Sequence, residues 1–128
     1  MLKGFEDYTG PLNDYERTIV LPRTASVLKA CNGPDRALTN KELREILLAK
    51  FNIRVTDPRV RAVINEIRTS DIVPYLVASS KGYYIATSVE EVEDYARTLD
   101  SRIREMTKVR NALLSQVEGK LFLNQSTI

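Results

Sequence analysis

The chain of 128 residues contains no histidine and a single cysteine, Cys31. Without an imidazole it lacks the commonest general base near neutral pH and every nucleophile triad that depends on one. A lone cysteine cannot form an internal disulfide, and without histidine the usual zinc ligand sets are missing. We therefore expect neither an enzyme nor a metal site.

Glycine is scarce as well, and the five glycines at positions 4, 10, 33, 82 and 119 are too scattered to form a phosphate-binding loop. No apolar run approaches the length of a membrane span, and the N-terminus has no signal-peptide-like apolar stretch. With 43% hydrophobic and 28% charged residues, the composition suits a globular domain with a core of its own. We expect no cofactor, no membrane association and a cytoplasmic location.

The net charge is only +2, but it is unevenly distributed. Residues 36–68 hold eight basic and four acidic residues, a local excess of +4, whereas residues 88–118 hold five basic and seven acidic residues. A basic excess on one segment is what a footprint on nucleic acid requires, although an ordinary solvated surface gives the same pattern.

The N-terminal part predicts an arm followed by a helix. Residues 1–12 carry two glycines, a proline and little apolar periodicity, so we expect a flexible arm. A helix begins at Asn13, with Glu16 as capping-box partner, and is kinked by Pro22, which lacks the backbone donor. We expect this helix to stop at Asn32-Gly33-Pro34, with glycine in the left-handed position.

Two further helices follow. Thr39 and Glu42 form a capping-box pattern at the start of the first, which should run to about Lys50. The second opens at Thr56 or Asp57, with Pro58 in its first turn, where a missing donor costs nothing. Its apolar residues recur at the i, i+3, i+4, i+7 spacing of a buried face. These residues are Val60, Val63, Ile64 and Ile67.

Two short runs, Tyr75–Ala78 and Tyr83–Ala86, flank the turn Ser79-Ser80-Lys81-Gly82 and predict a hairpin in which Gly82 can take a positive φ. A helix, two capped helices and then a hairpin is the order of a winged helix-turn-helix. We therefore predict a mainly α (α+β) fold, with a winged helix-turn-helix domain over residues 13–87 and a two-stranded wing.

Residues 88–118 predict one long helix, capped by Ser88 and Glu91. Apolar residues recur along it at alternating spacings of three and four, interrupted only by Arg110, which is a heptad pattern. Such a stripe either closes the winged core or pairs two copies of the chain, and we expect a homodimer, parallel or antiparallel. The residues expected to form the dimer contact are Leu99, Ile103, Met106, Leu113 and Val117. Residues 119–128 have no pattern and are expected to form a flexible tail.

The residue types near the wing suggest a partner. Arginine can fork to guanine and asparagine can pair with adenine in the major groove, while lysine and serine suit backbone phosphates. At 100° per residue, Arg61, Asn65 and Arg68 lie within roughly 60° of one another and away from the apolar stripe. The residues expected to contact DNA are Arg59, Arg61, Asn65, Arg68, Lys81, Ser79, Ser80, Asn40, Lys41 and Arg44. The alternative is an ordinary solvent-exposed face.

Three runs carry a resemblance: Leu38–Leu43, Arg59–Arg68 and Ala78–Ala86, which read LTNKEL, RVRAVINEIR and ASSKGYYIA. Together with the charged helix after them, they resemble small winged helix-turn-helix proteins encoded by bacteriophages and prophages, over roughly residues 12–115. The turn between the central helices, residues 52–56, is longer than in the simplest helix-turn-helix.

That resemblance implies a protein of the host cell cytoplasm that binds double-stranded DNA as a transcriptional regulator or a replication accessory factor. The alternative is a protein-binding module in a phage replication or virion assembly, with a phage or host replication protein as its partner.

Overall fold

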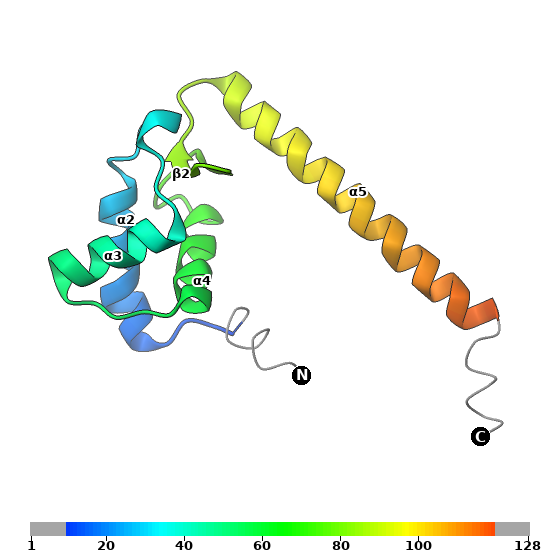
Figure 1. The fold of residues 1–128 in the computed structure, drawn as a ribbon, viewed down its shortest axis with the longest axis horizontal. Coiled ribbons are helices and arrows are strands. Elements are labelled where there is room, and N and C mark those ends of the chain that lie inside the picture. The colour runs from blue at the N-terminus through cyan, green and yellow to red at the C-terminus, as the bar shows by residue number, and fades with distance from the viewer. Residues whose placement is uncertain (1–9, 120–128) are drawn as a thin grey trace. The chain divides into compact units, whose positions relative to one another are not determined.

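The computed structural model describes residues 10–119, which fall into two compact units that meet between Val92 and Glu93. The first unit holds every element up to the hairpin, and the second is the greater part of one long helix (Figure 1). The described residues are mainly helical with one small antiparallel sheet, which confirms the expected α+β class. Most of the predicted arm, residues 1–9, and the tail from residue 120 lie outside the described residues.

The first helix is interrupted near its middle. It opens with the predicted capping box, in which the Asn13 amide donates to Glu16 Oε1 (2.9 Å) and the Glu16 amide donates to Asn13 Oδ1 (2.8 Å). Glu16–Val20 form a π-helical turn, η1, and the α-helix α2 follows over Leu21–Leu28 with Pro22 in its first turn. A proline ring lacks the amide hydrogen and crowds the preceding turn. The kink predicted at Pro22 is therefore present as the π-helical turn Glu16–Val20, just before the proline.

The helix ends at Leu28, not at residues 32–34 as the sequence predicted. The Cys31 amide donates to the Leu28 carbonyl (2.9 Å) in a tight last turn, and the Cys31 carbonyl then accepts from the Ile85 amide (2.7 Å). Pairing with Ile85 requires extended backbone from residue 31 onward, so a tertiary contact ends the helix earlier than the local signals do.

The segment between α2 and the next helix lies along the hairpin. After a short 3-10 turn, η2 (Pro34–Arg36), the Leu38 amide donates to the Tyr83 carbonyl (3.1 Å) and the Tyr83 amide donates to the Leu38 carbonyl (2.8 Å). A Cβ added to Gly82 would lie 2.3 Å from the Leu38 carbonyl atoms, and Gly82 has φ +121°. Glycine is required here because the two backbones touch and the dihedral is unfavourable for any other residue.

Helix α3 covers Asn40–Phe51 and has the predicted capping box. The Glu42 amide donates to the Thr39 hydroxyl (3.2 Å), and the Thr39 amide donates to Glu42 Oε1 (2.9 Å). Its end is set by Asn52 in the left-handed conformation, with φ 55° and its amide bonded back into the helix.

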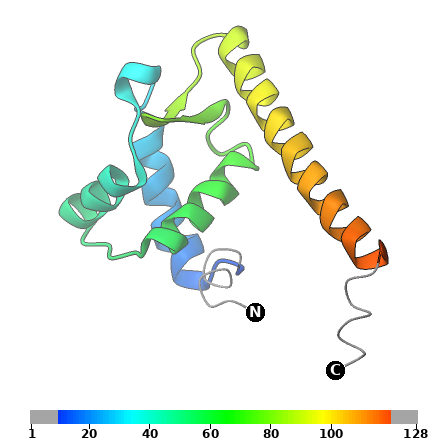
Figure 2. The same cartoon turned by 45° about the vertical axis from the view of Figure 1, so that its right-hand side comes forward.

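Helix α4 covers Asp57–Arg68, and the Thr56 hydroxyl accepts from the Arg59 amide (3.4 Å) at its N-cap. The predicted stripe is confirmed, because all four of its apolar residues are buried. They pack with side chains of α2 and α3 in one core. Its largest fully buried side chains include Leu28, Leu43, Leu47, Ile64 and Ile67. Figures 1 and 2 show the three helices grouped beside the hairpin.

Strands β1 (Leu76–Ser79) and β2 (Gly82–Ile85) form the predicted hairpin, each shifted one residue toward the turn. The register pairs Ser79 with Gly82 and Leu76 with Ile85. Tyr75, predicted to begin the first strand, has φ 65°, a left-handed conformation that ends the extended backbone there.

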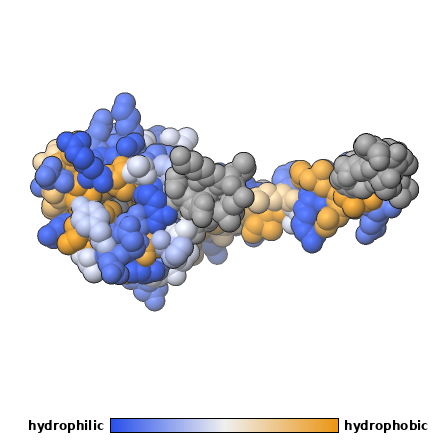
Figure 3. Space-filling model, turned by 90° about the horizontal axis from the view of Figure 1, so that it is seen from below, coloured by the Kyte–Doolittle hydropathy of each residue, from blue (hydrophilic) through white to orange (hydrophobic). Residues whose placement is uncertain are grey.

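Helix α5 covers Val89–Gly119, as the sequence predicted. The Glu91 amide donates to the Ser88 hydroxyl (3.2 Å), as the predicted capping box requires. The Glu91 carboxylate, however, accepts from the Thr87 amide (2.6 Å) and not from the Ser88 amide. Hydrophobic side chains form patches along its exposed surface (Figure 3).

Candidate nucleic-acid interface

A cleft of about 400 Å³ opens between the N-terminus of α3, the N-terminus of α4 and the hairpin. We call it the hairpin cleft. It is lined by Thr39, Asn40, Lys41, Asp57, Arg61, Ala78, Ser79, Ser80, Gly82 and Tyr83. The structure thus brings together Asn40, Lys41, Arg61, Ser79 and Ser80 from three elements, all of which the sequence predicted as DNA contacts.

Backbone contacts fix this arrangement. The capped start of α3 directly follows Leu38, which is hydrogen-bonded to Tyr83 in β2, so Asn40 must lie beside the hairpin. The first turn of α4 approaches from the other side, because α3 and α4 pack against each other. The Thr39 and Thr56 caps use part of the backbone donors at these two helix starts, and the Asp57 carboxylate lies at the same cleft. The positive charge at the cleft therefore comes from the Lys41 and Arg61 side chains.

Arg61 is held in position at this cleft. Its Nε donates to Asp57 Oδ2 at 2.9 Å, one turn earlier on the same helix. With the Asn40 amide turned to suit its neighbours, Asn40 Oδ1 accepts from Arg61 Nη2 (3.1 Å) and Asn40 Nδ2 donates to the Tyr83 hydroxyl (3.1 Å). The Arg61 side chain remains 48% exposed. The orientation of the Arg61 guanidinium is therefore fixed by Asp57 and Asn40, while about half of the side-chain surface remains exposed to solvent.

The rest of the predicted α4 face follows Arg61 along the helix. Asn65 is exposed and Arg68 is half-buried. Both lie on the flank of α4 that carries Arg61, as their spacing of four and seven residues requires.

At the hairpin tip, Lys81 is exposed, whereas the Ser79 hydroxyl accepts from the Lys81 amide (3.1 Å) and donates to the Gly82 carbonyl (3.3 Å). Ser79 therefore shapes the turn that presents Lys81.

Arg59 faces the first helix rather than the hairpin cleft. Its Nη2 and Nε donate to Glu16 Oε1 (2.6 Å) and Oε2 (2.8 Å), a bidentate ion pair. Its guanidinium also donates to the carbonyls of Gly10 (3.2 Å) and Pro11 (3.1 Å). We therefore leave Arg59 out of the proposed interface and assign it to fastening the N-terminal segment onto α4. The helical wheel carries a signal for this, since Arg59 lies about 160° from Arg61 at 100° per residue.

Glu16 is a buried charge, and its spacing from Asn13 in the sequence indicates only its role in the capping box. Its side chain is 7% exposed, against 20% for Arg59. The hydrogen bonds from Arg59 lower the pKa of the Glu16 carboxyl below its usual 4.5, against the opposing effect of burial, with the Asn13 hydrogen bond adding to the decrease. This ion pair is fully hydrogen-bonded, so its role is structural.

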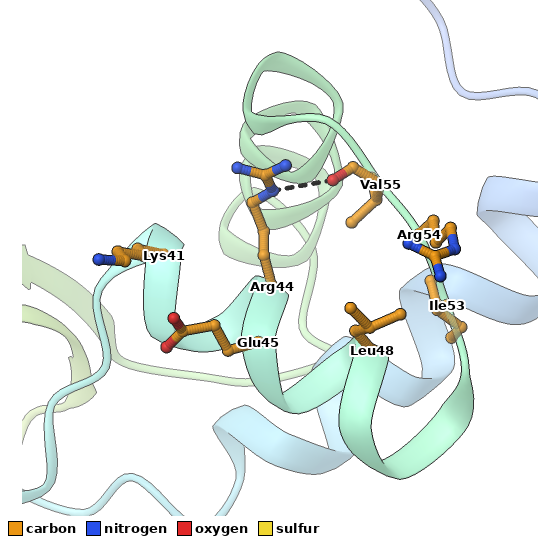
Figure 4. Close-up of a pocket in the computed structure, with 7 residues that line it drawn as sticks. All are labelled: Lys41, Arg44, Glu45, Leu48, Ile53, Arg54 and Val55. Carbon is orange, nitrogen blue, oxygen red and sulfur yellow. Dashed lines mark hydrogen bonds between the residues drawn. The ribbon is translucent and has the colours of Figure 1, made fainter.

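Arg44 also has a structural contact. Its Nε donates to the Val55 carbonyl (2.8 Å), across the turn that joins α3 to α4 (Figure 4). This bond lies at a second hollow, which is lined by Lys41, Arg44, Glu45, Leu48, Ile53, Arg54 and Val55. Arg44 remains exposed and adds positive charge beside Lys41 and Arg54, while the bond helps to hold the longer turn in place.

Across residues 10–119 no group of three or more histidine, cysteine, aspartate or glutamate side chains could hold a metal ion. Burial raises the pKa of the Cys31 thiol, which favours its protonated, less nucleophilic form. In the same range no helix combines the length and the apolar character needed to cross a bilayer.

Comparison with protein-family models, with curated proteins and with solved structures finds no match.

Proposed function

We propose that this chain binds duplex DNA as a winged helix-turn-helix protein, with α4 in the major groove and the hairpin against the flanking backbone. The order of elements supports the winged assignment: a first helix, the extended Leu38 segment, α3, α4 and then a hairpin that pairs with Leu38. The observation that carries the proposal is the convergence of Lys41, Arg61 and the hairpin turn at one open cleft.

The geometry suggests a role for each group. Arg61, oriented by Asp57 and Asn40, is suited to donate two hydrogen bonds to guanine O6 and N7, because a fixed guanidinium loses little conformational entropy on binding. Asn65, one turn further along, is suited to adenine. Asn40 then acts as a positioning residue for Arg61 rather than as a direct phosphate contact.

Other residues are suited to contact the DNA phosphate backbone. Lys41 at the start of α3 and Lys81 at the hairpin tip lie on elements that flank α4, where phosphates would pass. Phosphate neutralisation makes binding salt-dependent, with log K falling by about 0.9 per contact for each tenfold rise in salt. A transcriptional regulator and a replication accessory factor would both use this surface.

The test begins with selection of bound duplexes from a random pool, followed by titration of the selected site by fluorescence anisotropy. Arg61→Ala should weaken binding by about 1–3 kcal/mol and relax the preference at one base pair. Arg104→Ala, which removes the same charge from the exposed surface of α5, is the matched control and should leave the preference unchanged. Equal losses for the two variants, or no binding to any duplex at low salt, would refute the proposal.

A protein-binding module is the second candidate, and one observation favours it. Tyr75 is 70% exposed and borders an apolar hollow with Ala86, Val89 and Val92. An exposed aromatic side chain beside an apolar hollow is typical of a protein contact. If Tyr75→Ser abolishes capture of a replication protein while DNA affinity is absent throughout, this candidate replaces DNA binding.

A further inference from the structure

Helix α5 carries exposed apolar side chains at heptad spacing. Met106 is 71% exposed, and Ile103, Leu113 and Val117 are each about half exposed or more. Leu99, at the same heptad spacing, is half-buried. A stripe of large apolar side chains that recurs over several helical turns is unusual on a surface that remains in water.

The heptad positions identify one charged residue within the stripe. Ala96, Ile103, Arg110 and Val117 recur every seven residues at one seam position, and Leu99, Met106 and Leu113 occupy the other. In a parallel pair of identical helices, residues at equal seam positions face their own copies. Arg110 would then face Arg110 of the second copy, and two like charges in an apolar seam oppose association.

Charge is also segregated along the helix. Residues 89–100 hold five acidic residues and one basic residue, whereas residues 101–118 hold four basic residues and two acidic ones. A parallel pair would place acidic half beside acidic half. An antiparallel pair separates the two acidic halves and brings Arg110, near the other end of each helix, beside the acidic half of the partner.

We propose that two copies of the chain associate through an antiparallel pair of α5 helices, aligned so that Ile103 of each lies opposite Met106 of the other. In this alignment Leu99 of one copy lies opposite Arg110 of the other. Asp100, next to Leu99, is then close enough to form an ion pair with that Arg110. The helix is 31 residues long, or about 45 Å at 1.5 Å per residue, so the pairing extends over several heptads.

The proposal has a consequence for how the first units are spaced. Each is joined to α5 at the N-terminal end of that helix, so the two attachment points lie at opposite ends of the pair, on the order of 40 Å apart. A parallel pair would bring them together. The pairing is independent of DNA binding, because it uses only α5 residues beyond the first unit.

Disulfide trapping distinguishes the two orientations in the full chain. With Cys31→Ala as the background, Ala96→Cys and Leu113→Cys are prepared as separate proteins, oxidised alone and then as an equal mixture. The antiparallel alignment places residue 96 opposite residue 113, so the expected result is a 96–113 crosslink in the mixture and little crosslinking of either protein alone. Efficient 96–96 or 113–113 crosslinks would overturn the proposal.

Charge reversal at Asp100 and Arg110 gives a second, independent test, in which self-association is measured by analytical ultracentrifugation. Asp100→Arg or Arg110→Asp alone should weaken self-association by about tenfold, since each dimer contains two such pairs, and combining them should restore most of the affinity. Lys108→Asp, on the back of the helix relative to the seam, is the matched control and should change it by less than about threefold. A monomeric parent protein, or a double variant no tighter than either single, would overturn the proposal.

Discussion

The buried Glu16–Arg59 ion pair allows a quantitative prediction that does not depend on function. Arg59→Met removes the guanidinium but keeps most of the side-chain volume, which leaves the Glu16 carboxylate only 7% exposed and without its bidentate partner. Removing one member of a buried pair costs about 3–5 kcal/mol, and the 20% exposure of Arg59 favours the lower end, about 3 kcal/mol. For a unit of this size that is a fall in Tm of roughly 12–24 °C.

The assay is chemical and thermal unfolding followed by circular dichroism at pH 7. Arg97→Ala serves as the matched control, because Arg97 forms an exposed ion pair with Asp94 and its loss should cost less than about 1 kcal/mol. The double variant Glu16→Leu/Arg59→Met should recover part of the loss, since it leaves no unpaired charge but also removes the acceptor of the Asn13 amide. A change below about 1 kcal/mol for Arg59→Met would refute the reasoning.

The same pair predicts how stability depends on pH. The pKa of Glu16 is lower in the folded state than its usual 4.5, so its contribution is fully present above about pH 4.5 and is lost as pH falls through the folded value. The Arg59→Met variant should therefore lose less stability than the parent between pH 5 and pH 2. A parallel decline of the two proteins over that range would contradict this assignment.

Three further outcomes follow from the structure. Gly82→Ala places a methyl group 2.3 Å from the Leu38 carbonyl and should destabilise the fold by more than about 2 kcal/mol in urea titration, with a loss below 0.5 kcal/mol contradicting the contact. Thr39→Ala removes one half of the α3 capping box and should cost about 1 kcal/mol by the same method, whereas Thr98→Ala, on exposed α5, should not. The buried Cys31 thiol should react with a disulfide reagent far more slowly in native protein than in urea, and equal rates would contradict its burial.

Signals that are local in the sequence predicted the helices well. The capping boxes at Asn13 and Thr39 and the buried stripe of α4 need only residues three or four apart, and the structure confirms them. The same locality explains α5, whose start at Val89 follows a cap at Ser88.

Contacts between residues far apart in the sequence could not be predicted from such local patterns. The first helix ends at Leu28 because Cys31 pairs with Ile85, and nothing near Leu28 encodes that partner. The ion pair between Glu16 and Arg59 joins residues 43 positions apart, so their pairing could be read only from the fold. The Asp57–Arg61 contact at the hairpin cleft differs, because its spacing of four residues on a predicted helix was a usable signal.

The two hydrogen bonds between Leu38 and Tyr83 have a consequence for how such a chain can change over evolution. They tie the start of α3 to the hairpin through main-chain atoms, which every amino acid except proline can supply, so the distance between these elements does not depend on what the surface side chains are. Substitutions at Lys41, Arg61 or Asn65 can then alter the chemistry displayed while the framework stays in register. A lineage could acquire new binding preferences by exchanging a few outward-facing residues, with Gly82 as the position where no exchange is tolerated.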